Sequence, residues 1–203
     1  MAQGYDAQTC GKMNMGYGPF DYRKSTQADR ELVEKFHFTP RVEALLDGAS
    51  TMKSELGADI AYLLHAFPNH PRGLLAMWRL SDQRKLDPPP RVPFTVACYF
   101  ERGLNLAKDD TVVRALYASF LASRNRKADA LAQLKIATHF AAENPISHHN
   151  IGLVYLDLKE PDLALEQAHK APEDGHEQFP GSNHGCGPTG SGRTRRHENR
   201  HPG

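Results

Sequence analysis

Apolar side chains recur at three- and four-residue spacing through residues 28–171, which is the spacing of one face of an α-helix. Short polar and proline-containing breaks interrupt this pattern at residues 68–71, 87–90, 108–110 and 143–145. No segment alternates strictly between apolar and polar positions, as a half-buried strand would. The chain is therefore predicted to be all-α, with successive helices joined by short turns.

The two ends of the chain differ from this helical region. Residues 1–27 are rich in Gly, Tyr and Met and show no helical periodicity, so they are predicted to form an irregular N-terminal strap. Residues 172–203 are rich in Gly, Pro and His, and Phe179 and Cys186 are almost their only apolar side chains. Such a segment buries too little surface to offset its chain entropy, and a disordered tail is predicted.

An internal repeat organises the second half of the helical region. Residues 145–171 can be laid over residues 111–137 at a constant offset of 34 positions. Small residues match small ones in this alignment, because Gly152 falls on Ala118 and Ala164 falls on Ala130. They are predicted to lie where the two helices of a hairpin approach closely. The large side chains predicted to fill the remaining space are Leu121, Leu134, Tyr155 and Leu165.

The period and one sequence segment are typical of a known repeat family. Residues 148–155 (HHNIGLVY) resemble the first-helix signature of tetratricopeptide repeats (TPR), whose period is also 34 residues. The resemblance implies a right-handed superhelix of helical hairpins; the alternative is an ordinary helical hairpin. Upstream, Pro71 and Thr111 are 40 residues apart, so one unit has about six extra residues, which we place in an enlarged loop over residues 84–93. About three hairpins are expected.

Further segments resemble one group of proteobacterial TPR-containing proteins. The matching segments are residues 17–22 (YGPFDY), 37–43 (HFTPRVE), 57–62 (GADIAY) and 66–70 (AFPNH). This resemblance implies a bacterial origin and, because proteins of the group are commonly exported past the inner membrane, a periplasmic location. The sequence as written has no leading apolar signal segment, which favours the cytoplasm instead. Residues 172–203 do not resemble the ending of the group.

Charge and hydropathy remove several classes of partner. Lys and Arg together number 25 against 24 Asp and Glu, so no excess positive charge favours binding to nucleic acid. Every apolar stretch is far shorter than the roughly 18 residues needed to span a bilayer, and no membrane span is expected.

Cysteine and histidine give little reason to expect a metal or another cofactor. Taken alone, Cys98 is predicted to be a small buried core residue. The alternative, in an oxidising compartment, is a disulfide bridge between Cys10 and Cys98 that would hold the N-terminal strap against the helices. Adjacent helical residues point about 100° apart, so His148 and His149 cannot chelate one ion together. No structural zinc spacing is present, and neither a metal nor a cofactor is predicted.

The sequence also lacks the motifs of common enzyme classes. It has no G-x-S-x-G nucleophile elbow, no phosphate-binding glycine loop and no HExxH helix. The paired carboxylates Asp109 and Asp110 precede a predicted helix, where a carboxylate normally caps free backbone N–H groups. The protein is therefore not expected to be an enzyme.

The remaining candidate is a binding surface. In TPR proteins the ligand contacts come from the concave face, which is formed by the first helix of each hairpin. Carried over by the resemblance, the candidate peptide-binding residues are Arg72, Leu75, Arg79, Ser119, His149, Asn150, Leu153 and Leu156. This implies a non-enzymatic scaffold for a protein or peptide partner, with Arg72 and Arg79 acting together on an acidic group. The alternative is self-association into a homo-oligomer through an uncapped terminal hairpin that exposes Leu163 and Leu165.

Overall fold

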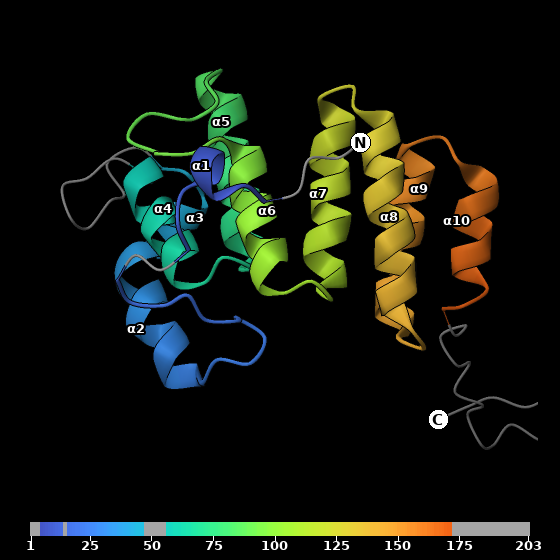
Figure 1. The fold of residues 1–203 in the computed structure, drawn as a ribbon, viewed down its shortest axis with the longest axis horizontal. Helices are drawn as coiled ribbons and strands as arrows, with labels where there is room; N and C mark the ends of the chain where they lie inside the picture. The colour runs from blue at the N-terminus through green and yellow to red at the C-terminus, as the bar shows by residue number, and fades with distance from the viewer. Residues whose placement is uncertain (1–4, 14–15, 47–55, 172–203) are drawn as a thin grey trace, which may run out of the picture. The chain divides into compact units, whose positions relative to one another are not determined.

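The computed structural model describes residues 5–13, 16–46 and 56–171 (Figure 1). These residues form α-helices and no strand, which confirms the predicted all-α class for this part of the chain. The predicted disordered tail, residues 172–203, lies outside the described residues. The helices are α1 (Ala7–Cys10), α2 (Gln27–His37), α3 (Pro40–Glu43), α4 (Leu56–Ala66), α5 (Pro71–Arg84), α6 (Val96–Leu106), α7 (Thr111–Ser123), α8 (Lys127–Ala141), α9 (Pro145–Asp157) and α10 (Pro161–Ala168).

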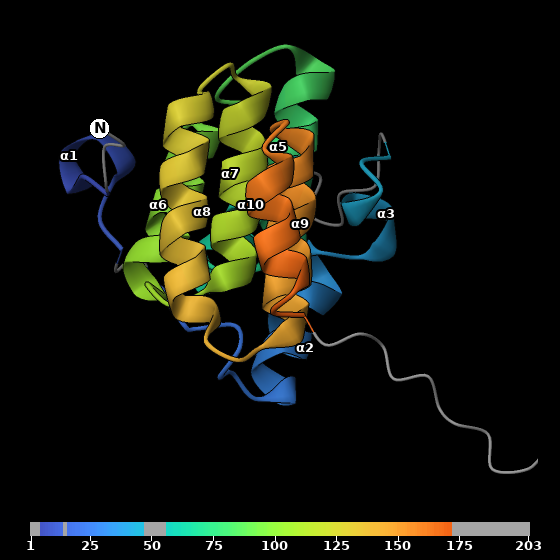
Figure 2. The ribbon, with the colours of Figure 1, turned by 90° about the vertical axis from the view of Figure 1, so that its right-hand side faces the viewer.

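Helices α7 to α10 form two consecutive antiparallel hairpins, α7 with α8 and α9 with α10 (Figures 1 and 2). Corresponding helix starts lie 34 positions apart and are capped in the same way. The N–H of Val113 donates to the side chain of Asp110 (3.1 Å), and the N–H of Ser147 donates to that of Asn144 (3.1 Å). The predicted 34-residue offset is therefore also an offset between equivalent hydrogen bonds.

A buried polar bridge joins the two helices of each of these hairpins. In the first hairpin Arg114 donates to the Gln133 side chain (2.8 Å) and to the carbonyl of Lys108 (2.7 Å). In the second, His148 lies 2.8 Å from the Gln167 side chain. His148 also donates to the carbonyl of Ala142 (2.7 Å), which is the equivalent of Lys108. His148, which was considered as a metal ligand from the sequence, therefore uses both ring nitrogens in hydrogen bonds within the fold.

The small residues of the repeat are buried as predicted, but one of the large residues is not. Ala118, Gly152, Ala130 and Ala164 are buried, as expected. Leu165 was predicted to fill the core and does not, because its side chain is 57% exposed. Helix α10 turns Ala164 and Gln167 inward, and a position next to Ala164 is rotated by about 100° out of that face.

The upstream hairpin, α5 with α6, has the enlarged loop that the sequence predicts. Helix α5 ends at Arg84 and α6 begins at Val96. Side-chain hydrogen bonds hold the loop near both ends: the Ser81 hydroxyl donates to the carbonyl of Leu86 (2.8 Å), and the Val96 N–H donates to the Asp87 carboxylate (2.8 Å). The extra residues therefore extend the connection without interrupting either helix.

The N-terminal strap packs on the helices through aromatic rings and a polar network. Phe20 and Tyr22 lie 6.1 and 5.7 Å from the Phe67 ring, in the turn between α4 and α5. Buried Asn69 donates to the carboxylates of Asp21 (2.7 Å) and Asp110 (3.0 Å). The aromatic residues therefore cover apolar surface at this turn, and the network ties the strap to α7.

The strap is more ordered than its sequence indicates, because residues 7–10 form the short helix α1, which packs on α6. The side chain of Asp6 caps this helix by accepting from the N–H groups of Gln8 (3.0 Å) and Thr9 (3.1 Å). A four-residue helix is too short for the periodicity by which longer helices are found in a sequence.

A pair of glycine substitutions tests the closest approaches. A Cβ on Gly103 would lie 2.6 Å from the carbonyl oxygen of Pro68, whereas a Cβ on Gly152 would lie 3.4 Å from its nearest neighbour, the Cβ of Gln167. We expect Gly103→Ala to lower the free energy of unfolding by roughly 1–3 kcal/mol through overpacking. Gly152→Ala serves as the matched control and is expected to raise it by up to about 1 kcal/mol through helix propensity. Urea denaturation measures both, and equal midpoints for the two variants would contradict the packing described.

Acid titration tests the strap network. The hydrogen bond from Arg23, assisted by that from Asn69, lowers the pKa of Asp21 from 3.8 to about 2. A lowered folded-state pKa stabilises the protein above pH 4, and this stabilisation is lost as the pH falls from about 4 to 2. Asp21→Asn removes this carboxylate. After allowance for solvent screening, we expect the free energy of unfolding of the variant to fall by roughly 1–2 kcal/mol less than that of the parent over this pH range. Denaturation from pH 5 to pH 2 measures it, with exposed Asp157→Asn as the control. A parent-like pH profile for Asp21→Asn would show that the network contributes nothing.

Candidate functional site

The predicted peptide-binding residues lie on three helices that pack side by side. Helix α7 contacts both α5 and α9, and these are the first helices of the three hairpins. Arg72, Leu75 and Arg79 lie on α5, Ser119 lies on α7, and His149, Asn150, Leu153 and Leu156 lie on α9. We call the exposed and half-buried side chains of these three helices the first-helix face.

Exposed apolar side chains gather on the α7 and α9 part of the first-helix face. Val112 is 43% exposed, and its equivalent in the next hairpin, Ile146, is 70% exposed. Leu153 and Leu156 follow on α9 and are 49% and 55% exposed. Ile146 and Leu153 are seven positions apart and so lie on nearly the same side of α9. We call these four residues the apolar patch.

The two arginines of α5 are in different situations. Arg72 makes a two-point ion pair with Glu43 of α3, in which its Nε donates to Oε1 (2.7 Å). It also lies over the Phe38 ring, 5.5 Å from the ring centroid. Arg79 is exposed, and its charge helps to lower the pKa of the same Glu43, although Arg72 has the larger effect. The chain's own Glu43 carboxylate therefore already pairs with Arg72, where an acidic group of a partner was expected. The spacing of the two arginines in the sequence could not indicate this pair.

The polar candidates on α7 and α9 differ in availability. The Ser119 hydroxyl donates to the carbonyl of Ala115 in its own helix (3.2 Å). His149 is exposed and Asn150 is half-buried. His149 and Asn150 therefore border the apolar patch, whereas the proton of Ser119 is used internally.

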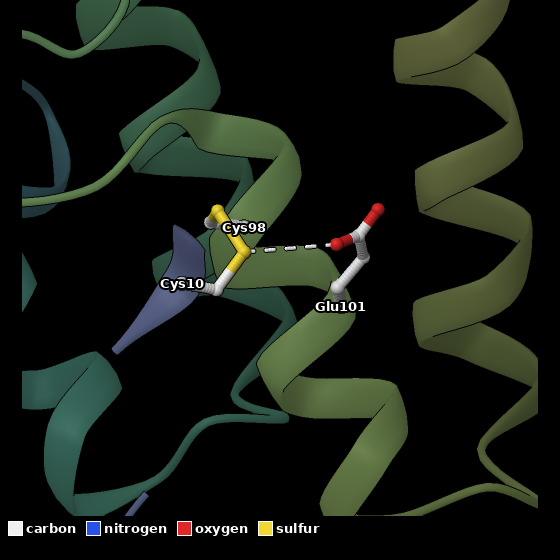
Figure 3. A group of neighbouring side chains, drawn as sticks. All are labelled: Cys10, Cys98 and Glu101. Carbon is white, nitrogen blue, oxygen red and sulfur yellow. Dashed lines mark hydrogen bonds between the residues drawn. A yellow bond between two sulfur atoms is a disulfide. The ribbon is translucent and has the colours of Figure 1, made fainter. Parts of the chain in front are cut away.

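A second cluster lies where the strap meets α6, and Figure 3 shows it. Cys10 of α1 and Cys98 of α6 form a disulfide with a Cα–Cα distance of 5.1 Å, which is the bridged alternative of the two that the sequence left open. Cys10 Sγ lies 3.7 Å from Oε2 of Glu101, and a bridged sulfur has no proton to donate in this contact. Burial raises the pKa of the Glu101 carboxyl, and the Tyr117 hydroxyl donates to its other oxygen (3.0 Å). We call Cys10, Cys98 and Glu101 the disulfide corner.

Next to the disulfide corner, a buried arginine binds the backbone of the strap. Nη1 of Arg102 donates to the carbonyls of Cys10 (2.8 Å), Gly11 (3.2 Å) and Lys12 (3.1 Å). Its side chain is fully buried and lies 5.1 Å from the centroid of the Phe94 ring. Sequence reasoning missed Arg102, because an arginine on an amphipathic helix normally reaches solvent.

Among the described residues, the disulfide corner is the one group of at least three His, Cys, Asp or Glu side chains whose potential ligand atoms lie close enough together to hold a metal ion. No helix within the described ranges has both the length and the apolar character needed to cross a membrane.

Comparison with known proteins adds no relative, because no protein-family model, curated protein or solved structure matches this chain.

Proposed function

We propose that this protein is a TPR-type scaffold, without catalytic activity, that binds a peptide segment of a partner protein on its first-helix face. The repeated caps and buried bridges of α7–α8 and α9–α10 support the TPR interpretation, because they recur at the period of that family. On this interpretation the hairpins form a right-handed superhelix, and the first-helix face is its concave side.

The observation that carries the proposal is the repeated exposure of equivalent apolar residues. Val112 and Ile146 occupy equivalent positions on neighbouring helices, and both are exposed. An exposed apolar residue that recurs at the period of a repeat forms a continuous surface, and such surfaces in repeat proteins bind extended or helical peptides. Leu153 and Leu156 extend the surface along α9.

The ligand that fits this surface combines apolar and acidic side chains. Apolar anchors would pack on the apolar patch, with His149 and Asn150 at its border. An acidic residue would approach Arg79, which is exposed on α5. The protein's own Glu43 would compete with that acidic residue for the neighbouring Arg72, because Glu43 already pairs with Arg72.

The disulfide supports a location outside the cytoplasm. Bridges such as Cys10–Cys98 form and persist in oxidising compartments, of which the bacterial periplasm is one. We therefore favour the periplasmic alternative that the family resemblance implies over the cytoplasmic one.

One observation favours the alternative function, self-association. Leu163 and Leu165 of α10 are both exposed, and α10 is the last described helix. Two chains that covered these residues with each other would form a dimer whose population depends on concentration. Sedimentation velocity across a concentration series, with the parent and Leu165→Asp, distinguishes this role from peptide binding.

A peptide library tests the first-helix face. Selection of a random-sequence library displayed on phage against the full chain is expected to enrich peptides that combine apolar residues with Asp or Glu. Leu153→Asp should weaken binding of these peptides at least about tenfold, because it places a charge within the apolar patch. Leu165→Asp, at a similarly exposed leucine on α10, is the matched control and should bind like the parent. If Leu153→Asp binds the selected peptides as tightly as the parent, the first-helix face is not the binding surface.

The competition between Glu43 and an acidic ligand can be tested separately. Glu43→Gln releases Arg72 from its ion pair, so peptides with an acidic residue should bind about two- to fivefold more tightly, which corresponds to about 0.4–1 kcal/mol. Glu166→Gln breaks an exposed ion pair with Lys170 on α10, outside the first-helix face, and should leave affinity unchanged. Fluorescence polarisation with one selected peptide measures both variants. Weaker binding by Glu43→Gln would mean that the carboxylate supports the surface and does not compete for it.

A further inference from the structure

The disulfide corner places three potential metal ligands together. Cys98 lies in the first turn of α6, and Glu101 follows one turn later on the same side of that helix, facing Cys10 of α1 (Figure 3). The two sulfur atoms and a Glu101 oxygen all lie within 4.8 Å of one another. In a tetrahedral zinc site the Zn–S and Zn–O bonds are about 2.3 and 2.1 Å, so ligand atoms are roughly 3.5–3.8 Å apart. Only a small separation of the sulfurs would be needed to reach this spacing.

The position of Cys10 does not depend on the disulfide alone. Arg102 binds the carbonyls of residues 10, 11 and 12, and the Tyr5 hydroxyl donates to the carbonyl of Gly11 (2.6 Å). Because these bonds involve the backbone, they remain when the sulfur–sulfur bond is broken. The reduced chain would therefore keep both thiols and the carboxylate at the corner.

We propose that the reduced protein binds one zinc ion at the disulfide corner, through the thiolates of Cys10 and Cys98 and the carboxylate of Glu101. This site is independent of the peptide-binding function proposed above. The three ligands line a cavity of about 460 Å³ together with Asp6, Thr9 and Arg126, so water could occupy the fourth position. Three protein ligands with an open fourth position is the arrangement of an accessible zinc site.

The electrostatics of the corner favour a dication once the bridge is open. Cys98 lies in the first turn of α6, where the helix dipole favours a nearby negative charge such as a thiolate. Two thiolates and one carboxylate have a formal charge of −3, which exceeds the combined positive charge of Arg126 in the cavity and of Arg102 beside the corner.

Reduction of the disulfide and binding of zinc are two separate steps. A dithiol reductant gives two electrons and two protons to the Cys10–Cys98 bridge and is itself oxidised to a cyclic disulfide. Zinc then displaces one proton from each cysteine thiol, and a third from Glu101 in those molecules in which that carboxyl is protonated. The zinc ion does not change its oxidation state.

Metal titration of the full chain tests the site. The background is Cys186→Ser, so that the only cysteines are those of the corner. The reduced and the oxidised chain are each titrated with Zn²⁺ against a chromophoric chelator, and with Co²⁺ to detect thiolate-to-metal absorption. Histidines bind equally in both forms, so the difference isolates the corner. We expect the reduced chain to bind one more zinc ion than the oxidised chain and to show the cobalt–thiolate band. Equal stoichiometry in the two forms would overturn the proposal.

Two variants identify the ligands. Cys98→Ser should abolish the additional site, and Glu101→Gln should weaken it at least about tenfold, whereas exposed Glu143→Gln should not. Unchanged zinc affinity in Glu101→Gln would exclude the three-residue site. Circular dichroism of the reduced, metal-free chain is measured in parallel. A loss of helix on reduction would also overturn the proposal, because the site requires the strap to stay in place.

Discussion

The hairpins α7–α8 and α9–α10 each depend on a buried polar bridge, which links the start of the first helix to the middle of the second helix and to the turn before the hairpin. Arg114 makes it with Gln133 and the carbonyl of Lys108, and His148 makes it with Gln167 and the carbonyl of Ala142. A buried donor or acceptor that loses its partner costs roughly 1–3 kcal/mol, so a rotation or slip of either helix is penalised. The bridge therefore fixes which side chains of α7 and α9 face outward, and the apolar patch follows from that register.

The N-terminal end of the row of hairpins is covered by the strap, whereas α10 at the other end has exposed leucines. At the N-terminal end the strap is held by aromatic packing on Phe67, by the Asn69 network, by the disulfide and by Arg102. At α10 the exposed Leu163 and Leu165 are not covered by described residues. Stabilisation of the strap thus comes from contacts between residues far apart in the sequence. The disulfide and the Arg102 hydrogen bonds also hold Cys10 next to Cys98 and Glu101, so they both attach the strap and form the candidate metal site.

The parts of the fold that were predictable are those with a periodic or local signal. The 34-residue offset located equivalent helices, and the prolines of residues 88–90 located the enlarged loop. The parts that were not predictable depend on tertiary contacts. Nothing in the local sequence shows that Arg72 pairs with Glu43 or that Arg102 is buried beneath the strap. Leu165 was wrongly assigned to the core because residue type was given more weight than its position on the helix.

The central claim is that the first helices of the hairpins form the ligand-binding surface. Hydrogen exchange monitored by mass spectrometry tests it directly, with the full chain alone and with a saturating library-selected peptide. The account predicts that backbone amides of Thr111–Ser123 and Pro145–Asp157 exchange more slowly in the complex than in the free chain. Slower exchange confined to Lys127–Ala141 and Pro161–Ala168, the second helices of the same hairpins, would contradict it.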